Sequence, residues 1–470
     1  MKLENNFIVP LSKNKKYHKK TFRKIVDQVV DEMSKQFGGE IIPEPFLDIE
    51  NFVGDLNDSQ CFENATKKLK IVYRYSTKTS HKFYLGQMDS VPTVGSMMAE
   101  LITSAVNNNM LSNEMSPFLT DLETSLLLRI QKRFGLGLNA SGIMTNGGTL
   151  ANIQALTIAR NVKLENKPIY SLNLPPVIFA SEHCHTSIDK AAMILGIGHE
   201  FVVKVNSQMG VMCIKDLERK INSYSAKSIP IAVVSTYGST NSGSLDPIDE
   251  IQYLCDKYKI WHHVDAVYGG ALAFTDHKLP DFSKVHSLSF NPQKWLFVAK
   301  TSSILFLNNK DYYISHFKTS LPYISQSSKT NIGEISLQGS RSGTALKLWL
   351  SLYLIGINGY MEIIKSNLKI AKDFYSYLAN HSNLKGYTKP DLNIVLFRSS
   401  KEGSFGVEIT EYIQKHLNSN SIYVSSINWE GDLWLKAVFL NPFFDNDSLK
   451  ELENKIEECL FIMHDKGKTP

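Results

Sequence analysis

The stretch Ser287–Val298, SLSFNPQKWLFV, places one lysine between a short apolar run and a block of large apolar residues. Ser287–Phe290 has the length and composition of a buried strand, and Asn291–Pro292 breaks it. Lys294 then stands directly before Trp295. A charged ammonium is costly in apolar surroundings unless it is paired or neutral, so Lys294 requires an explanation.

Two explanations compete for Lys294. It could sit at a solvated strand end, with its aliphatic stem lying over Trp295. Alternatively, it could be held as a Schiff base with a carbonyl cofactor. The first is the commoner case for a single lysine. The rest of the chain supplies further groups that such a cofactor needs, and this favours the second.

Composition limits the class of protein. The chain has 470 residues, of which 43% are hydrophobic and 21% charged, as in a globular enzyme. A net charge of +5 is too small on this length to favour a nucleic-acid partner. No run of about 18 apolar residues is present, so we expect no membrane span, and no secretory signal follows the N-terminal charges. Five scattered cysteines without CxxC spacing indicate reduced thiols in a cytoplasmic protein, with neither disulfides nor a metal site.

From Gly142 onward, short apolar runs alternate with helical stretches, which predicts an α/β fold with a mainly parallel central sheet. Polar motifs follow most of these runs. They therefore stand at the carboxyl ends of the expected strands, where ligands bind in such sheets. The expected strands are Pro176–Ala180, Ile231–Ser235, Ile260–Val264, Leu288–Phe290 and Ser303–Leu307.

The C-terminal part predicts a small antiparallel sheet with strands at Asn393–Phe397, Ile422–Val424 and Trp434–Leu440. A closing helix is expected at Ser448–Leu460, with a Ser448/Glu451 capping box. A similar box, Thr120/Glu123, is expected to open a helix over Thr120–Phe134.

Four motifs carry the candidate chemistry. Asn146–Asn152, NGGTLAN, brings paired glycines and Thr149 to a helix start, which suits a phosphate, although a plain turn is commoner. His183–Ser187, HCHTS, has three interpretations. One histidine could be a core residue, or the two could bind a metal, although no partner cluster with ligand spacing appears. The third interpretation is that His185 faces a planar ligand. Thr236–Thr240, TYGST, ends a strand in small and hydroxyl residues. Asp265, in HHVDAVYGG, needs a cationic partner, and a protonated pyridine nitrogen would be one.

In order and spacing, these motifs resemble the group II pyridoxal phosphate-dependent amino-acid decarboxylases. The resemblance runs from about Phe83 to Pro442 through HKFYLGQM, NGGTLAN, CHTSIDKAA, STYGSTNSGSLDPI, HVDAVYGG, FNPQKW, SLQGSRSG and ALKLW. It implies the aspartate-aminotransferase-like fold (fold type I) with a small C-terminal α+β domain. It also implies pyridoxal phosphate as cofactor and a homodimer. The expected domains are a dimer-wrapping helical segment at 1–90, the cofactor-binding domain at 91–350 and the small domain at 351–470.

The resemblance assigns a role to each matching position. Lys294 would form the Schiff base, Asp265 would pair with the pyridine nitrogen, and His185 would stack on the ring and handle protons. Gly148, Thr149 and Asn291 would hold the phosphate, with Thr236 near the cofactor. Arg341 would bind a substrate carboxylate through its planar fork, and Gln87 would lie on the substrate side.

The chain departs from the family pattern in three places. Gln293 replaces a common histidine, and Val267 replaces a common alanine beside Asp265. The segment Ile324–Ile335 lacks the catalytic tyrosine that aromatic-acid decarboxylases carry in a mobile loop, and Tyr323 matches a structural position better. The proton donor to the alpha carbon is therefore open.

We expect decarboxylation of an L-amino acid to its amine and carbon dioxide, with acidic amino acids slightly favoured over aromatic or diamino acids. One alternative keeps the fold but acts as an aldehyde synthase or carbon–carbon lyase. A non-enzymatic alternative is a cofactor-binding pseudoenzyme.

Overall fold

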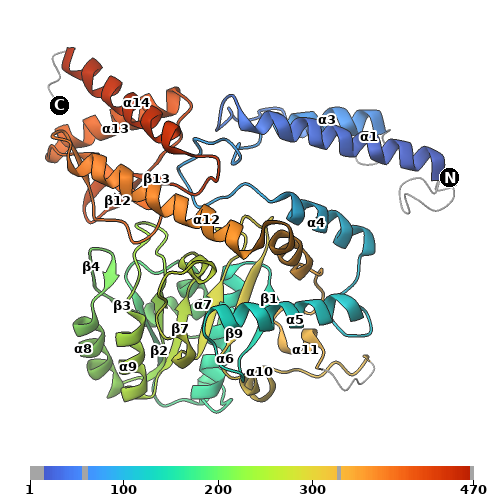
Figure 1. The fold of residues 1–470 in the computed structure, drawn as a ribbon. Helices are drawn as coiled ribbons and strands as arrows, with labels where there is room; N and C mark the ends of the chain where they lie inside the picture. The colour runs from blue at the N-terminus through green and yellow to red at the C-terminus, as the bar shows by residue number, and fades with distance from the viewer. Residues whose placement is uncertain (1–14, 55–61, 325–329, 466–470) are drawn as a thin grey trace.

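The fold is known from a computed structural model that describes residues 15–54, 62–324 and 330–465. A seven-stranded sheet lies at its centre, and Figure 1 shows the C-terminal elements gathered at one end of it. Its strands are β1 (Ser141–Thr145), β2 (Pro176–Ser181), β3 (Val202–Val205), β6 (Ile229–Thr236), β7 (Trp261–Asp265), β8 (Ser287–Phe290) and β9 (Ser303–Leu307).

The strand order β1-β9-β8-β7-β6-β2-β3 decides where the polar motifs meet. Strand β9 runs antiparallel to both β1 and β8, and the remaining pairs are parallel. Six strands therefore end at the same edge of the sheet, and the loops that follow β1, β2, β6, β7 and β8 lie along it. The predicted parallel sheet and its five strands are confirmed. Strands β1 and β3 were not expected.

Helices cover both faces of this sheet, because its strands are apolar on both sides. Ile178 and Ala180 of β2 pack in one hydrophobic cluster, and the alternating residues Val177 and Phe179 pack in another. The helices of this part are α4 (Val94–Val106), α5 (Pro117–Arg133), α6 (Gly148–Lys163), α7 (Ser187–Ile194), α8 (Ile214–Ser225), α9 (Ile248–Tyr258), α10 (Asp311–His316) and α11 (Ile332–Ile335). A small hairpin of β4 (Ser207–Gln208) and β5 (Val211–Met212) lies between β3 and α8.

The C-terminal part is a four-stranded antiparallel sheet in the order β10-β11-β13-β12 with three helices. Its elements are α12 (Ala345–Ala379), β10 (Leu384–Gly386), β11 (Ile394–Ser399), α13 (Gly403–Ser419), β12 (Ser425–Trp429), β13 (Asp432–Val438) and α14 (Asn446–Asp465). The predicted strand at Ile422–Val424 is wrong by a few residues, since β12 begins at Ser425. Helix α12 is interrupted at Gly356, whose φ of 73° favours glycine.

Both predicted capping boxes are wrong. Helix α5 begins at Pro117, so Thr120 lies inside it, and Glu123 binds Arg341 and the Met144 N–H, not the N–H of Thr120. Helix α14 begins at Asn446, and the Oδ1 atom of Asp445 accepts hydrogen bonds from the N–H and Oγ of Ser448.

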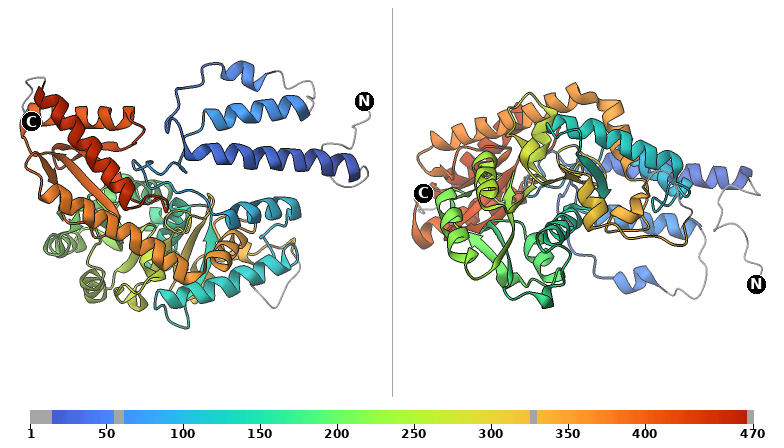
Figure 2. Two further views of the ribbon diagram at one scale, coloured as in Figure 1. Left: turned by 45° about the horizontal axis from the view of Figure 1, so that its top comes forward. Right: turned by 90° about the horizontal axis from the view of Figure 1, so that it is seen from below.

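The N-terminal helices α1 (Lys15–Ser34), α2 (Ile49–Val53) and α3 (Phe62–Arg74) project from the body (Figures 1 and 2). Helices α1 and α3 lie side by side in both figures. Among the helices of the described residues, none combines the length and apolar character needed to cross a membrane.

Candidate active site

Lys294 lies in the turn after β8, at the edge where the parallel strands end. Its Nζ atom lies 5.6 Å from the centre of the Tyr268 ring and 3.7 Å from the sulfur of Met88. Tyr268 is fully buried, stacks on Trp295 with ring centres 5.2 Å apart, and donates a hydrogen bond to Asn393. Burial lowers the pKa of Lys294, although Asp265 and Asp89 oppose the shift. The amine is therefore easier to deprotonate, as a nucleophilic amine requires.

Asp265 ends β7 as a buried carboxylate held by two donors. Its Oδ2 atom accepts a hydrogen bond from the Asn152 amide at 2.9 Å, and Oδ1 accepts one from the Val267 N–H at 3.2 Å. Strand pairing places Asp265 beside Thr236 on β6 and Ser289 on β8. Its side chain is thus fixed in place, beside the turn that carries Lys294.

His185 follows β2, and its ring is hydrogen-bonded to Ser187 at the start of α7. Its Nδ1 atom accepts a hydrogen bond from the Ser187 N–H at 3.1 Å and lies 2.8 Å from the Ser187 hydroxyl. Burial lowers the pKa of His185, and the charge of Asp265 opposes the shift while Lys294 adds to it. Since Asp265 and Lys294 both act on this ring, the three residues predicted to be catalytic lie together.

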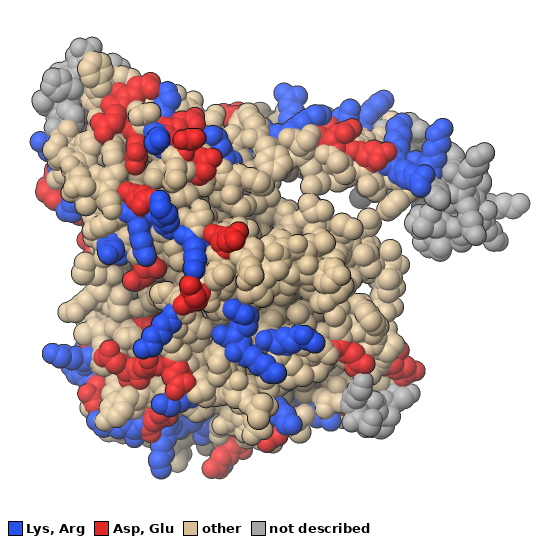
Figure 3. Space-filling model, viewed as in Figure 1, with Lys and Arg blue, Asp and Glu red and all other residues tan. Residues whose placement is uncertain are grey.

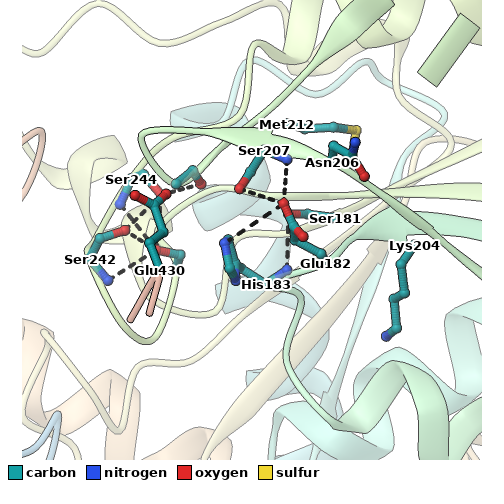
Figure 4. Close-up of polar contacts among 12 residues, drawn as sticks. Ser181, Glu182, His183, Lys204, Asn206, Ser207, Met212, Ser242, Ser244 and Glu430 are labelled. Atoms are coloured by element: carbon teal, nitrogen blue, oxygen red, sulfur yellow. Dashed lines mark hydrogen bonds and ion pairs between the residues drawn. The ribbon is translucent and has the colours of Figure 1, made fainter. Parts of the chain in front are cut away.

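His183 takes a different direction from His185. Its ring packs on Trp429 of β12, with ring centres 4.0 Å apart, so it joins the two parts of the chain. Figure 4 shows His183 beside Glu182, whose carboxylate accepts hydrogen bonds from the N–H and hydroxyl of Ser207. Among the described residues there is no group of three or more His, Cys, Asp or Glu side chains that could hold a metal ion.

The start of α6 forms an open cradle against the turns after β7 and β8. Gly147 has a φ of 109°, and the helix has no side-chain cap at this end. A Cβ atom added to Gly148 would lie 2.8 Å from Val267 and 3.1 Å from the Asn291 amide nitrogen. Backbone N–H groups at a helix start, next to a side-chain amide, suit an anion. Thr149 lies in the first turn of this helix.

Thr236 supplies a second feature that suits a bound group. Its side chain is 7% exposed, yet its Oγ1 atom has no hydrogen-bond partner among the described residues. Buried hydroxyls are normally satisfied, so this atom is placed to meet a bound group.

Gln87 meets a buried lysine that the sequence analysis missed. Lys436 of β13 is 3% exposed, and its Nζ atom donates a hydrogen bond to the Oε1 atom of Gln87 at 3.2 Å. Burial lowers the pKa of Lys436, and the charge of Lys294 lowers it further, while Asp89 opposes both. Lys436 therefore lies close enough to Lys294 to interact with it. The sequence did contain a signal for Lys436, namely a lysine within the apolar run WLKAVFL.

The segment before Gln87 reaches Lys436 because it adds to the C-terminal sheet. Leu85 donates its N–H to the carbonyl of Tyr423 and accepts one from Val438 at 2.7 Å. The carbonyl of Gly86 accepts a hydrogen bond from the Ser425 hydroxyl. Two parts of the chain more than 300 residues apart thus build one wall of the site.

The Arg341 guanidinium is not free to bind a ligand, because it forms a buried ion pair. Its Nη1 and Nη2 atoms donate to Glu123 at 2.9 and 2.6 Å, and both side chains are 1% exposed. Glu123 also accepts a hydrogen bond from the Met144 N–H at 3.0 Å. The fork expected to bind a substrate carboxylate is therefore already occupied inside the protein.

The departures from the family pattern have structural roles. The side-chain oxygen of Gln293 accepts a hydrogen bond from the Ser302 N–H at 2.6 Å and so holds the turn before β9. Val267 packs against Gly148 and donates its N–H to Asp265. Residues 325–329 of the segment without the expected tyrosine lie outside the described residues.

The pyridoxal-dependent decarboxylase conserved domain matches residues 49–400, three quarters of the chain. The chain belongs to the pyridoxal-dependent decarboxylases. Two curated relatives are the proteins named acidic amino acid decarboxylase GADL1 of Xenopus tropicalis and Mus musculus, each 29% identical. The matches cover 72% and 73% of this chain and 69% and 65% of the relatives.

Solved structures confirm the expected fold of this decarboxylase family. Mouse CSAD in its apo form superposes with a TM-score of 0.87 at 22% identity, over 94% of this chain and 98% of that one. Oryza sativa TDC with PLP and tryptamine gives a TM-score of 0.88 at 19% identity, over 95% and 98%. The predictions of family, fold and pyridoxal phosphate as cofactor are therefore confirmed.

The residues at the sheet edge fit pyridoxal phosphate. The α6 start and Asn291 offer donors for a phosphate, and the Thr236 hydroxyl is buried and unpaired. The Asp265 carboxylate would suit a ring nitrogen, and the lowered pKa of Lys294 would suit an amine that bonds to the aldehyde. The residue roles themselves belong to the proposal below.

Proposed function

We propose that this decarboxylase removes carbon dioxide from an acidic L-amino acid, of the aspartate or glutamate class, and releases the amine. The observation that carries the substrate class is the buried Lys436, whose Nζ atom donates to the exposed Gln87 and whose pKa the charge of Lys294 lowers. The names of the two curated relatives support the same class.

Bound pyridoxal phosphate supplies an aldehyde that condenses with amines and a protonated ring that accepts the electron pair left by carbon dioxide. Lys294 would hold the cofactor through its Nζ amine. Its lowered pKa provides the neutral amine for this bond.

Asp265 keeps the ring nitrogen protonated, because a buried carboxylate favours a cation beside it. Asn152 and the Val267 N–H hold the carboxylate in one orientation. Gly148, Thr149 and Asn291 bind the phosphate, with Thr236 beside the cofactor. His185 would stack on the ring and would handle the proton at the alpha carbon.

Lys436 and Gln87 bind the second carboxylate of the substrate. A 3% exposed lysine without a carboxylate partner among the described ion pairs is costly, and a substrate anion relieves that cost. The Gln87 amide adds an N–H donor. Aromatic side chains would leave the ammonium with the Gln87 oxygen as acceptor but without an anion.

The test is a product screen with the cofactor-loaded enzyme. Aspartate and glutamate are compared with tryptophan, tyrosine, lysine and 2,4-diaminobutyrate, and amine, aldehyde, ammonia and carbon dioxide are measured. We expect equal amounts of amine and carbon dioxide from an acidic amino acid. Turnover of aromatic or diamino acids alone would refute the substrate class. Aldehyde plus ammonia would identify an aldehyde synthase, and absence of any turnover a pseudoenzyme.

A Lys436→Met variant tests the anchor directly, because methionine keeps the length and removes the charge. Loss of a buried charge-assisted contact costs about 2–4 kcal/mol, so kcat/KM for the acidic substrate should fall about thirty- to a thousandfold. The cofactor affinity should stay within about twofold. Unchanged kcat/KM would contradict the anchor.

We also propose a homodimer. Helix α4 buries Ser96, Ala99 and Thr103 but exposes a row of apolar side chains on its other face: Val94, Met98, Leu101, Ile102 and Val106. In Figure 3 the region over α4 is almost free of charged side chains. Light scattering should give twice the chain mass of 53.0 kDa, and Leu101→Glu should shift the species toward monomer. An active wild-type monomer at micromolar concentration would contradict the proposal.

We place the enzyme in the cytoplasm. Within the described part of the chain, Cys184, Cys213, Cys255 and Cys459 are free thiols, which suits a reducing compartment. Fractionation of cells that express a tagged chain would test the location.

A further inference from the structure

Asn152, on the second turn of α6, bonds to Asp265 and, through Ser187, is linked to His185, the two groups that the proposed function places at the cofactor ring. It is 1% exposed, and both ends of its amide are bonded. The Nδ2 atom donates to Asp265 Oδ2 and to Ser187 Oγ, both at 2.9 Å. The Oδ1 atom accepts from His263 Nε2 at 3.0 Å and from Ser289 Oγ at 2.8 Å.

The direction of every hydrogen bond in this network follows from Asp265. An ionised carboxylate only accepts hydrogen bonds, so the NH₂ end of Asn152 must face it. The Asn152 oxygen then points to His263, whose Nε2 atom must carry the proton. The Nδ1 atom of His263 in turn accepts from the Ser287 hydroxyl at 2.8 Å, and that hydroxyl accepts from the Trp261 N–H at 2.9 Å. Every side chain named here is at least 94% buried, so water does not compete.

The hydrogen bond from Asn152 to Ser187 is the second arm of the network. This arm determines which ring nitrogen of neutral His185 carries the proton. The Ser187 hydroxyl accepts from Asn152, so its own proton is free to point at His185 Nδ1, 2.8 Å away. The Ser187 N–H donates to the same nitrogen at 3.1 Å. With two donors aimed at Nδ1, that nitrogen is an acceptor, and a neutral His185 carries its proton on Nε2.

We propose that Asn152 is a positioning residue that orients the Asp265 carboxylate and, through Ser187, holds neutral His185 as its Nε2–H tautomer. Burial lowers the pKa of His263 to about 4, which keeps that histidine neutral and the network in one state at neutral pH. The inference rests on the proposed roles of Asp265 and His185 at the cofactor.

The first test compares three variants by the affinity of the apoenzyme for pyridoxal phosphate and by the pH titration of the bound cofactor's visible absorbance. Asn152→Ala removes both donors, and Ser187→Ala removes only the His185 arm. Ser289→Ala is the matched control, because it removes a buried hydroxyl from Oδ1 and leaves both donors in place.

We expect Asn152→Ala to bind the cofactor about ten- to a hundredfold more weakly, since it leaves a buried carboxylate with one donor fewer. The midpoint of its absorbance titration should shift by about one pH unit or more. Ser289→Ala should stay within about twofold of wild type, and Ser187→Ala should keep the absorbance titration. If folded Asn152→Ala behaves like Ser289→Ala in both measurements, the proposal is wrong.

The second test uses the wild-type apoenzyme, so it does not depend on whether a variant folds. Nitrogen-15 NMR of histidine-labelled protein, assigned with a His185→Gln variant, should show the Nε2–H tautomer of His185 at neutral pH. The Nδ1–H tautomer would overturn the proposal. Neither test requires substrate turnover, so a wrong substrate class would leave them interpretable. Asp265→Ala with an unchanged absorbance titration would instead show that the proposed role of Asp265 fails.

Discussion

Lys294 is the proposed Schiff-base residue, and its surroundings explain why a lysine there differs from a surface lysine. Tyr268, Met88 and Trp295 surround it with apolar atoms, and burial lowers its pKa. Because the pKa is lower, a larger fraction of the amine is neutral at a given pH. The neutral form is the one that reacts with an aldehyde.

The covalent site gives the first prediction at this scale. Borohydride reduction of the cofactor-loaded enzyme, followed by peptide mapping, should place the pyridoxyl group on Lys294. Lys294→Ala should lose the label and the visible absorbance of the bound cofactor. Lys300→Ala is the control, because Lys300 pairs with Asp89 on the surface of the same site. A label on another lysine would refute the assignment.

Arg341 and Glu123 give a prediction about stability. Arg341→Ala leaves the Glu123 carboxylate buried and unpaired, which should cost about 3–5 kcal/mol of folding free energy. The cost should appear as a lower midpoint in urea unfolding. The double variant Arg341→Met/Glu123→Gln removes both charges and should recover much of the loss.

A substrate role for Arg341 would give a different result. Arg341→Ala would then keep its unfolding midpoint and raise KM for the acidic substrate alone. The double variant would not restore that KM. The two measurements together therefore distinguish a structural ion pair from a carboxylate anchor.

Among the elements, the start of α6 shows how a strand, a turn and a helix make a site together. Strand β1 delivers the chain to the sheet edge, and Gly147 turns it with a positive φ. Gly148 then lets the helix approach Val267 and Asn291, with no room for a Cβ atom. The family alanine at position 267 is a larger valine here, so Gly148 is the more tightly confined.

Gly148→Ala should therefore disturb the cradle. The added methyl group would lie 2.8 Å from Val267 Cγ2, so a neighbour must shift. We expect the affinity for pyridoxal phosphate to fall about tenfold or more, as measured by titration of the apoenzyme. Adding Val267→Ala should restore part of the loss, because the closest contact disappears. Unchanged affinity of Gly148→Ala would contradict this account of the α6 start.

Strands were predicted better than helix starts. The five predicted strands of the central sheet are short apolar runs that both faces of the sheet bury, and that composition is local information. The starts of α5 and α14 were placed wrongly because Thr120 and Ser448 had plausible partners three residues on. The actual start of α5 depends on Pro117, and that of α14 depends on Asp445. Both also depend on contacts elsewhere.

At the scale of the whole molecule, the buried histidines His262 and His263 of β7 predict that the folded protein loses stability in acid. Burial lowers the pKa of His262 to about 3 and that of His263 to about 4. In the unfolded chain both protonate as the pH falls through about 6.5, while in the folded protein they stay neutral. The folded state therefore loses stability as the pH falls from about 6.5 toward 4, by about 2 kcal/mol for each histidine at pH 5.

A His262→Asn variant tests this prediction by removing one titrating group. Its own stability at pH 7 should fall, because Gln252 and Ser235 lose a partner. Its further loss between pH 7 and pH 5, measured by urea unfolding, should be smaller than that of wild type by about 2 kcal/mol. An identical pH dependence would show that His262 does not titrate as the structure indicates.

By itself, the sequence determined the α/β class, five of the seven strands of the central sheet, the family and the lysine, aspartate and histidine at the strand ends. These follow from local patterns, because parallel strands that end in polar motifs must bring them to one edge. Only the tertiary structure decided which charges pair. Arg341 meets Glu123 from 218 positions away, and Lys436 meets Gln87 from 349 positions away. Asn152 joins Asp265 across 113 positions. Such contacts depend on how sheet, helices and C-terminal part pack together, and spacing within a motif carries no information about that packing.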